Sequence, residues 1–569
     1  MEPSCTTKAL LAFLLGCNLL FPASCFTQRG NLVVTPESRL VTGRRRSFHG
    51  CPSMKQNIDD ECDIVVIGAG IGGLCCAGLL AKEGYSVQVF ESHTIPGGCA
   101  HSFVREGFHF DSGPTIYAGF SREPSNPLKT VLDRLGEDVP MIEYDGWGML
   151  TPEGPFKFTL GPAPFRAELR RRAADPERAL AEFDRLLARS QELHGAAMGL
   201  PASALRADGW AALPLLKYLP QLVRAAGEAR TLQGPFTDVM AEVGVTDKFL
   251  TDWLNALAFS LSGLEADGTM GAAMAYTLAD LHREGACLDY PRGGGGELIE
   301  ALVRGVEKHG GKLHLGKHVE EILVEGGRAA GVRLRSGGRH VRARRAVVSN
   351  APVWNTVDLF PPGALPADVA TAAKDIPKTE SYLHLHLGID GTGLDTSGLH
   401  PHYTVINSWE GIADPLNMMA ISFPTLLDPS LAPEGCHVIH AYCAGNEPYG
   451  IWAEHPRGSP EYERLKQERG EALWRAVERI VPDVRQRAKV ALVGSPVTHA
   501  RFLRRADGTY GPVFDLQTQK FPQPDVIPME GFLCCGDSIS PGIGVPAVAV
   551  SGMNAAHTLM PVWRHLALA

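Results

Sequence analysis

Apolar runs, glycine turns and helical stretches alternate from about residue 63, and this order predicts a βαβ unit. Residues 64–67 are four consecutive β-branched aliphatic residues, which is typical of a strand buried on both faces of a parallel sheet. The turn Gly68-Ala69-Gly70-Ile71-Gly72-Gly73 comes next. A helical stretch then leads to a second apolar strand at residues 86–90, which ends at an acid, Glu91.

The remaining pattern divides into a helical half and a strand-rich half. Residues 120–281 are mostly helical, with regular apolar spacing over residues 167–193. Residues 382–387 and 438–442 alternate apolar and polar side chains, which predicts two strands, and a charged helix is expected at 461–480. After the leader, no apolar run reaches the length of a membrane span.

Each glycine of the first turn has a role in a dinucleotide-binding unit. Gly68 permits the tight turn, Gly70 the approach of a pyrophosphate, and Gly73 the close packing of helix on strand. The free N–H groups at the helix N-terminus favour phosphate. Glu91 follows Gly73 by 18 residues, near the spacing of a carboxylate that binds a ribose diol. This carboxylate disfavours NADP and leaves FAD or NAD.

Two further glycine-rich segments favour FAD. Pro96-Gly97-Gly98 lets the backbone pass close to a long ligand. Near the C-terminus an apolar strand ends at Asp537, and the loop Pro541-Gly542-Ile543-Gly544-Val545-Pro546 opens a small-residue helix at 547–559. Asp537 is suited to a ribityl hydroxyl, and the helix N-terminus to negative charge on the flavin pyrimidine.

From about residue 63 the chain resembles the carotenoid isomerase, phytoene desaturase and retinol saturase group of FAD-dependent, amine-oxidase-like flavoproteins. The resemblance lies in the glycine turn, in Gly536-Asp537-Ser538 with the Pro-Gly-Ile-Gly-Val-Pro loop, and in a middle block at residues 290–296, 319–322 and 345–351. It implies that Val319 touches the adenine through its backbone. The residues expected to bind FAD are Gly68, Ala69, Gly70, Gly73, Glu91, Gly97, Gly98, Val319, Asp537, Gly544 and Val545.

The Pro-Gly-Ile-Gly-Val-Pro loop is similar to that of the carotenoid isomerases and the related retinol saturases, and the chain as a whole resembles the prolycopene isomerase-like branch. This resemblance implies cis–trans isomerisation of a carotenoid polyene with reduced FAD and no net redox change. The alternatives are a hydratase that adds water across an unsaturated xanthophyll bond, a desaturase or saturase, and a flavin-bearing carotenoid carrier. The chain departs from the isomerases at Cys99-Ala100-His101, where those carry small residues. His101 is therefore a candidate catalytic residue near the flavin.

The predicted fold is α/β, a split Rossmann-type FAD-binding domain with an α+β substrate domain formed by two insertions. The expected segments are a signal peptide (1–25), a plastid transit-like segment (26–58), FAD-binding parts (59–120, 285–353 and 525–569), a helical substrate- or membrane-facing insertion (121–284) and a substrate domain (354–524).

The leader predicts a plastid location. Residues 1–25 carry Lys8, an apolar run and a small-residue end, which is the pattern of a signal peptide. Phe26 and an acid-poor stretch rich in Arg, Ser and Thr follow, resembling the bipartite leaders of algae with secondary plastids. Plain secretion is the alternative, and many thiols without disulfide spacing argue against it.

The segment 210–230 predicts peripheral contact with the plastid membrane. It mixes Leu and aromatic residues with Lys217, Arg224 and Arg230, as a membrane-surface segment does. The alternative is an ordinary helix pair packed on the core.

Composition excludes other classes of partner. The net charge of −9 is spread over mixed signs, without a basic stripe, so no nucleic-acid partner is expected. The thirteen cysteines form no CxxC pair that would indicate zinc. His384 and His386 share one face of a strand, but no third ligand lies nearby in sequence, so no metal is expected.

Other candidate groups lie in the second insertion. Glu447 is a candidate general acid or base, with a satisfied turn carboxylate as the alternative. Residues 498–502 and 508–512 resemble family segments that line or shape the substrate tunnel.

Overall fold

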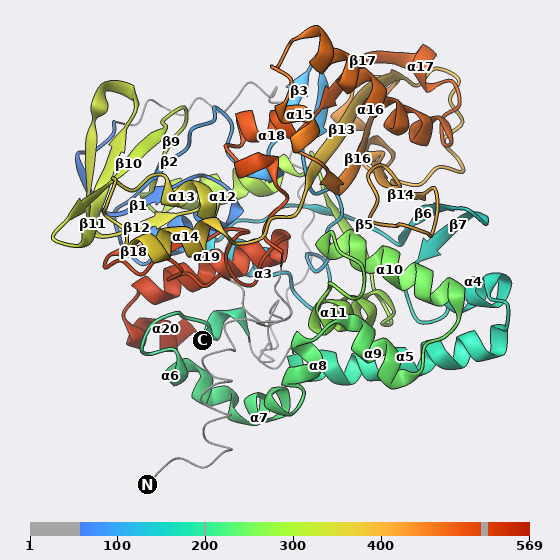
Figure 1. The fold of residues 1–569 in the computed structure, drawn as a ribbon, viewed down its shortest axis with the longest axis horizontal. Coiled ribbons are helices and arrows are strands. Elements are labelled where there is room, and N and C mark those ends of the chain that lie inside the picture. The colour runs from blue at the N-terminus through green and yellow to red at the C-terminus, as the bar shows by residue number, and fades with distance from the viewer. Residues whose placement is uncertain (1–56, 198–200, 514–521, 569) are drawn as a thin grey trace, which may run out of the picture.

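A computed structural model describes residues 57–197, 201–513 and 522–568. The predictions for residues 1–56, including the signal peptide, lie outside the described residues. Two seven-stranded sheets organise the described chain (Figure 1).

The first sheet joins three pieces of chain that are far apart in sequence. Its order is β10-β11-β12-β1-β2-β9, and β18 pairs with β12. The strands are β1 (Glu61–Ile67), β2 (Val87–Phe90), β9 (Lys312–His314), β10 (Val319–Glu325), β11 (Arg328–Leu334), β12 (His340–Ser349) and β18 (Phe532–Cys534). Because β1, β2, β12 and β18 run parallel, their carboxyl ends meet at one edge of the sheet. This arrangement confirms the predicted split Rossmann-type architecture.

Helices cover both faces of this sheet. On one face the buried side chains of four helices share a core with β1 and β2: α2 (Ile71–Lys82), α3 (Pro127–Leu135), α12 (Gly296–Lys308) and α19 (Val545–Leu559). On the other face α13 (Val353–Val357) and α14 (Ala367–Lys374) contribute to a second core. Burial on both faces explains why the strand at residues 64–67 is uniformly apolar.

The second sheet is built from both insertions, as predicted. Its order is β17-β13-β16-β15-β14-β6-β7. The strands are β6 (Gly146–Thr151), β7 (Gly154–Thr159), β13 (Ser381–Asp390), β14 (His402–Ile406), β15 (Met418–Ser422), β16 (Cys436–Glu447) and β17 (Ala488–Gly494). Strands β6 and β7 come from the first insertion and the others from the second. The charged helix α16 (Pro460–Glu478) packs its apolar side on this sheet.

The first insertion is helical, as its apolar spacing predicted. It contains α4 (Pro164–Arg172), α5 (Pro176–Ala197), α6 (Ala212–Leu215), α7 (Leu219–Gly227), α8 (Ala229–Gln233), α9 (Phe236–Val243), α10 (Lys248–Ser262) and α11 (Gly271–Leu281). The helix expected over 167–193 is divided into α4 and α5, because Pro176 begins a new helix. Within the described residues, no helix combines the length and apolarity needed to cross a membrane.

Short elements complete the chain. They are β3 (Ser102–Arg105), β4 (Phe108–Asp111), β5 (Met141–Tyr144), β8 (Leu288–Pro291), α15 (Gly450–Ala453), α17 (Val484–Arg487), α18 (Pro496–Phe502) and α20 (Val562–Leu568). The hairpin β3–β4 starts just after the Gly97-Gly98 turn, and β4 packs against β16. The hairpin therefore connects the two sheets.

Candidate active site

The glycine turn between β1 and α2 has the geometry that its sequence predicted. Gly68 has a φ of 95°, a conformation that favours glycine. A Cβ on Gly73 would stand 2.3 Å from the Gly68 carbonyl oxygen, so only glycine lets α2 begin this close to the strand. The N-terminus of α2 has no side-chain cap and no acid in its first turn. Its N–H groups are therefore suited to an anionic ligand.

Asn350, at the end of β12, lies directly beneath the glycine turn. A Cβ on Gly70 would stand 2.7 Å from its Nδ2, and a Cβ on Gly72 or Gly536 would stand 2.8 Å from its Oδ1. The turn thus needs its small residues for the Asn350 amide as well as for a ligand. Sequence reasoning included Asn350 in the middle block but gave it no role; its position directly after a buried strand was the available signal.

The Gly97-Gly98 segment lies beside this turn. The Gly97 N–H donates to the Ala69 carbonyl over 2.7 Å, and Gly97 forms a parallel bridge with Gly70. A Cβ on Gly98 would stand 3.3 Å from the Gly70 Cα. The two glycine-rich loops therefore lie side by side, and their glycines leave room for a ligand to approach the backbone.

Glu91 lies at the carboxyl end of β2, next to the same turn. Its Oε2 accepts from the Ala69 N–H over 2.8 Å and its Oε1 from the His93 N–H over 2.7 Å. The Lys317 N–H donates to the Glu91 carbonyl over 2.7 Å, which holds the start of β10, and hence Val319, near this loop. The position suits a ribose contact by the carboxylate.

The C-terminal piece reaches the same edge of the sheet. After β18, the Cys535 N–H donates to the Ser349 carbonyl, and the loop leads to Asp537. Gly544, with a φ of 104°, and Val545 begin α19, whose N-terminus has neither a side-chain cap nor an acid in its first turn. A Cβ on Gly552 would stand 2.2 Å from the Gly72 carbonyl oxygen, so α19 packs directly against α2.

Asp537 is paired with Arg505, a residue that sequence reasoning missed. The Arg505 guanidinium is almost fully buried and donates to the Asp537 Oδ2 over 2.6 Å and to the Tyr510 carbonyl over 2.9 Å. Burial raises the pKa of the Cys99 thiol. The charge of Arg505 opposes this rise and the charge of Asp537 adds to it. The loop after Gly98, this ion pair and Tyr510 therefore lie together. Arg505 falls in a loop without regular pattern, so only the fold identifies it.

These residues fit FAD. Two uncapped helix N-termini, two glycine loops that a Cβ would fill, and a carboxylate at the ribose position converge at one edge of the first sheet. The donors are N–H groups for phosphate, and the acceptors are carboxylates for hydroxyls. The set of expected residues is thus brought together from all three pieces of chain.

The second sheet presents a polar, aromatic face toward this edge. Residues of β13 alternate: Leu383, Leu385 and Leu387 join the core under α16, and Tyr382, His384 and His386 point to the other face. His440 and Tyr442 of β16 stand beside them, with His386 opposite His440. The alternating patterns at 382–387 and 438–442 predicted these two strands. Which residue of one strand lies opposite which residue of the other is set by the strand register, which the patterns do not give.

Two further rings lie against this face. Tyr382 contacts the His499 ring at 5.6 Å between centroids and the Tyr510 ring, edge-on, at 4.9 Å. Burial raises the pKa of Tyr382 well above its usual range and lowers the pKa of His499 to about 3. The segments 498–502 and 508–512 therefore bring His499 and Tyr510 beside the polar face of the second sheet.

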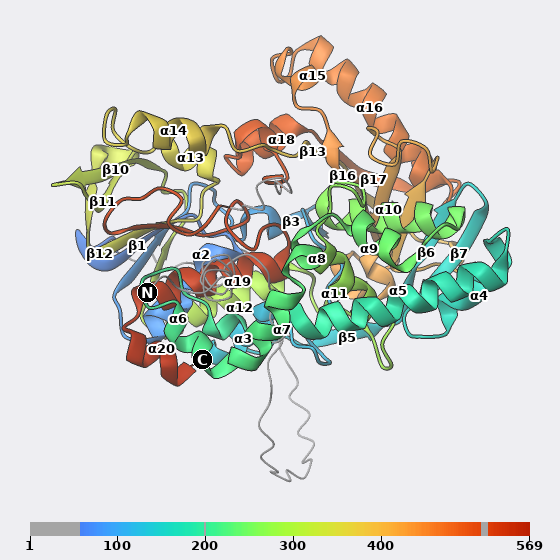
Figure 2. The same ribbon diagram turned by 60° about the horizontal axis from the view of Figure 1, so that its bottom comes forward.

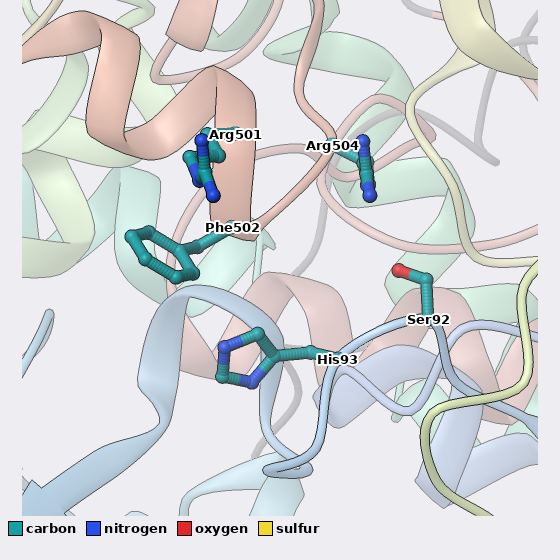
Figure 3. Close-up of a pocket in the computed structure, with 5 residues that line it drawn as sticks. All are labelled: Ser92, His93, Arg501, Phe502 and Arg504. Carbon is teal, nitrogen blue, oxygen red and sulfur yellow. The ribbon is translucent and has the colours of Figure 1, made fainter. Parts of the chain in front are cut away.

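An open pocket of about 420 Å³ lies at the surface beside Glu91 (Figure 3). Its lining residues are Ser92, His93, Arg501, Phe502 and Arg504. The His93 ring packs against Phe502 on one side and against His101 on the other, with centroids 5.7 Å and 5.5 Å apart. The pocket therefore leads from solvent toward the loop that carries His101.

The two candidate catalytic residues have different surroundings. His101 follows the Gly98 loop, where its Nδ1 lies 2.8 Å from the Gly98 carbonyl, and burial lowers its pKa to about 4. Glu447 is fully buried on the α16 side of the sheet, where Arg469 donates to both its oxygens and the Trp452 indole to one. This carboxylate fixes α16 to the sheet and has no room to accept a substrate proton.

His384, His386 and His440 bring potential metal-ligand nitrogens within 4.8 Å of one another.

Comparison with known proteins agrees with this geometry. The family model described as "Flavin containing amine oxidoreductase" matches residues 71–560. Prolycopene isomerase 1, chloroplastic, of an Oncidium hybrid cultivar is 31% identical over 529 residues, covering 88% of this chain and 84% of that protein. All-trans-retinol 13,14-reductase of Rattus norvegicus is 26% identical, covering 81% and 78%.

Solved structures share the fold. An oxidoreductase from Methanosarcina mazei matches with a TM-score of 0.57 at 20% identity, over 86% of this chain and 98% of that one. Putrescine oxidase bound to putrescine matches with a TM-score of 0.58 at 16% identity, over 87% and 98%. The split architecture, the cofactor edge and these matches lead to one conclusion: the chain is an FAD-binding member of the flavin-containing amine oxidoreductase family, in the group that resembles the carotenoid isomerases.

Proposed function

We propose that this protein is an FAD-dependent plastid enzyme that isomerises a carbon–carbon double bond of a carotenoid polyene. The relatives named chloroplastic prolycopene isomerases support it, at 31% identity over most of both chains. Relatives named retinol reductases are less similar, at 26%. Prolycopene and all-trans-retinol, after which these relatives are named, are polyenes, and a polyene suits the aromatic rings of Tyr382, Tyr442 and Tyr510.

The observation that carries this proposal is the relation of the two sheets. Arg505 connects the two, because it donates to Asp537 at the cofactor edge and to the carbonyl of Tyr510, whose ring contacts Tyr382 of the second sheet. Bound FAD supplies the electron-rich ring system of the reaction. The chain's own residues hold the cofactor by Glu91 and the glycine loops, orient the polyene between aromatic rings, and exclude bulk water from the double bond.

The test is product analysis with purified, flavin-loaded enzyme under anaerobic photoreduction. The enzyme is incubated with candidate carotenoids, the products are separated by chromatography, and their masses are measured by mass spectrometry. We expect a geometrical isomer of unchanged mass, and none with enzyme kept oxidised. A gain of one water identifies the hydratase, and a change of two hydrogens identifies the desaturase or saturase. Bound carotenoid with no product would leave only a carrier.

We also propose peripheral contact with a membrane, through what is here named the lipid-facing surface. Six exposed large apolar side chains form it: Trp210, Leu213, Leu216, Leu219, Val223 and Trp563. They come from two distant segments, α6 to α7 and α20, which run along the same edge of the molecule (Figure 2). Lys217 joins the segments by donating to the Leu566 carbonyl over 3.1 Å.

Charge around the lipid-facing surface supports the same proposal. Lys217, Arg224 and Arg230 are exposed beside it. A basic rim around exposed Trp and Leu is the composition of segments that lie in the interface of a membrane with anionic lipids. A carotenoid is dissolved in such a membrane, so this surface would bring the enzyme to its substrate.

A further inference from the structure

Four histidines gather at the polar face of the second sheet, and a fifth, His101, lies in the loop after Gly98. His384, His386 and His440 stand on neighbouring strands, and His499 approaches from α18. His101 lies on the far side of Phe103, whose ring contacts both His101 and His386. The segments 382–387, 438–442 and 498–502 that contain four of these histidines stood out in the sequence, but the reaction proposed above assigns these four no role.

Three of these rings form a hydrogen-bonded chain. The His384 Nδ1 lies 2.8 Å from the His440 Nε2, and the His384 Nε2 lies 2.8 Å from the His499 Nε2. A neutral imidazole offers one donor and one acceptor, so His384 can donate at one end while it accepts at the other. Such a chain transfers a proton by exchanging tautomers. The His440 Nδ1 is buried without a partner, so the chain does not continue past His440 in the described protein.

The chain is neutral at rest. Burial lowers the pKa of His384 and His440 well below the usual range, and their histidine neighbours add to this. Burial, and after it the charge of Arg505, lowers the pKa of His499. Asp111 turns its carboxylate to Ser102, Tyr290 and Gly295, and only its backbone carbonyl meets His386. Among the described residues no carboxylate is hydrogen-bonded to the three rings, so a proton added to them is bound weakly.

The ring orientations favour this chain over a metal site. His386 and His440 are stacked 4.2 Å apart with planes 7° from parallel, whereas His384 meets His440 edge to edge, with centroids 5.1 Å apart. A metal lies in the plane of each imidazole that binds it, along the nitrogen lone pair. The stacked His386 and His440 rings direct their lone pairs side by side rather than to one point. The 2.8 Å separation of the His384 and His440 nitrogens is the length of a shared proton.

We propose that the chain His440–His384–His499 is the acid–base device of the active site, with His499 as the residue that meets the polyene. This inference rests on the proposed function. His499 is half-buried whereas His384 and His440 are buried, and its Nδ1 is the ring nitrogen outside the chain. His384 and His440 act through it as positioning residues.

The step balances without an oxidant. His499 first takes a proton from water at its Nδ1. The electron pair of one polyene double bond then forms a new C–H bond as the Nδ1–H bond of protonated His499 breaks, leaving its pair on nitrogen. The carbon skeleton now carries the positive charge, and the former double bond rotates as a single bond. The C–H bond then breaks, the double bond reforms, and the proton returns to Nδ1. Capture of the same cation by water, with its proton passed to Nδ1, would give the hydratase product.

The first test uses the flavin-loaded enzyme in D₂O, with either a cis or an all-trans carotenoid. Protonated carbon carries two hydrogens and loses either one, so we expect deuterium in recovered polyene, measured by mass. Isomerisation without deuterium would overturn the acid–base chain and leave the proposed function standing. Deuterium exchange in the all-trans compound without any isomer would support the chain and overturn isomerisation.

The second test uses His499→Gln and His384→Gln, which keep hydrogen-bonding groups but transfer no proton. We expect exchange to fall roughly 10²- to 10⁴-fold, the usual contribution of acid–base catalysis, with flavin absorbance retained. The control is His282→Gln, a buried imidazole in the helical insertion, which should leave exchange unchanged. If His384→Gln loses flavin, His499→Gln decides, since His499 is at the end of the chain.

Two results would overturn the proposal. One is deuterium exchange at the wild-type rate in both His499→Gln and His384→Gln. The other is stoichiometric zinc or iron in the purified wild type that His384→Gln removes, which would assign the three imidazoles to a metal. Elemental analysis of the purified proteins gives this answer independently of catalysis.

Discussion

At the scale of single residues, the cofactor site depends on polar groups held by backbone. Glu91 accepts two backbone N–H groups, from Ala69 and His93, and this fixes its carboxylate beside the glycine turn. Asp537 is held instead by the guanidinium of Arg505, which donates to its Oδ2 over 2.6 Å. Both carboxylates are oriented before a ligand arrives, which reduces the entropy lost on binding.

Replacing Glu91 should therefore weaken cofactor retention. A hydrogen bond to a charged group contributes about 1.5–3 kcal/mol, so Glu91→Ala should raise the Kd for FAD roughly 10- to 100-fold. The measurement is flavin content after dialysis and fluorescence titration of the apoprotein. Glu325→Ala, which removes an exposed partner of Arg342, is the matched control and should change neither. Full occupancy in Glu91→Ala would contradict the ribose assignment.

At the scale of elements, helix α19 packs on α2 at glycine positions, where the two backbones come into direct contact. Gly552 has no room for a Cβ, because the Gly72 carbonyl oxygen would stand 2.2 Å away. Gly195, in α5, has nothing within 4 Å of its Cβ position. The two glycines lie in helices but differ in their surroundings, so they form a matched pair.

Gly552→Ala should separate α19 from α2, lowering both the unfolding temperature and the flavin content. Gly195→Ala should leave flavin content unchanged and stabilise the protein by up to about 1 kcal/mol, the helix-propensity difference. Thermal unfolding and flavin absorbance of the purified variants measure both effects. Equal stability of the two variants would show that α19 does not pack this closely.

The polar face of the second sheet predicts a pH dependence of stability. Burial lowers the pKa of His386 and His101 to about 4, below the ordinary value of 6.5. Above pH 6.5 native and unfolded states are both neutral. Below it the unfolded chain takes protons that the native state refuses, so stability falls by up to about 1.4 kcal/mol per pH unit for each imidazole, down to about pH 4.

Denaturant unfolding across this pH range gives the measurement. We expect a shallower slope in His386→Gln than in the wild type, because one of the contributing imidazoles is removed. An unchanged slope would mean that this histidine is protonated in the native protein.

Sequence reasoning recovered the elements better than their partners. The turn at Gly68–Gly73 and the acid Glu91 follow local rules, so the βαβ unit was predictable, and its candidate FAD residues lie together as expected. The contacts of Asn350 and Arg505 were not, because they join chain segments more than 30 residues apart. Likewise, alternation put His384 and His386 on one face, but register alone brings His440 opposite His386.

At the scale of the whole molecule, the helical insertion and the C-terminus build the lipid-facing surface together. Trp563 of α20 is 69% exposed and Leu216 is 61% exposed, and their segments are joined by the hydrogen bond from Lys217 to the Leu566 carbonyl. Exposed aromatic and aliphatic groups on one edge cost solubility unless something covers them. A membrane is the partner that the proposed substrate requires.

Replacing Leu216, Val223 and Trp563 with Ser should reduce binding to vesicles that contain anionic lipid by about tenfold or more. The control replaces Val104 and Ile116 with Ser, which are 41% and 45% exposed but lie outside this surface. Flotation of the purified proteins with vesicles measures the bound fraction. Equal flotation of both variants would remove the membrane from the proposal, and turnover of detergent-solubilised carotenoid should be the same in both.

The pairing of β18 with β12 has a consequence for how the enzyme matures. A polypeptide emerges from a ribosome, or from a translocation pore, with its N-terminus first. The nucleotide edge contains residues from 68 to 545, and the helix that seals it ends at Leu559. Cofactor capture must then be one of the last events of biosynthesis, and any chain that terminates early is left colourless.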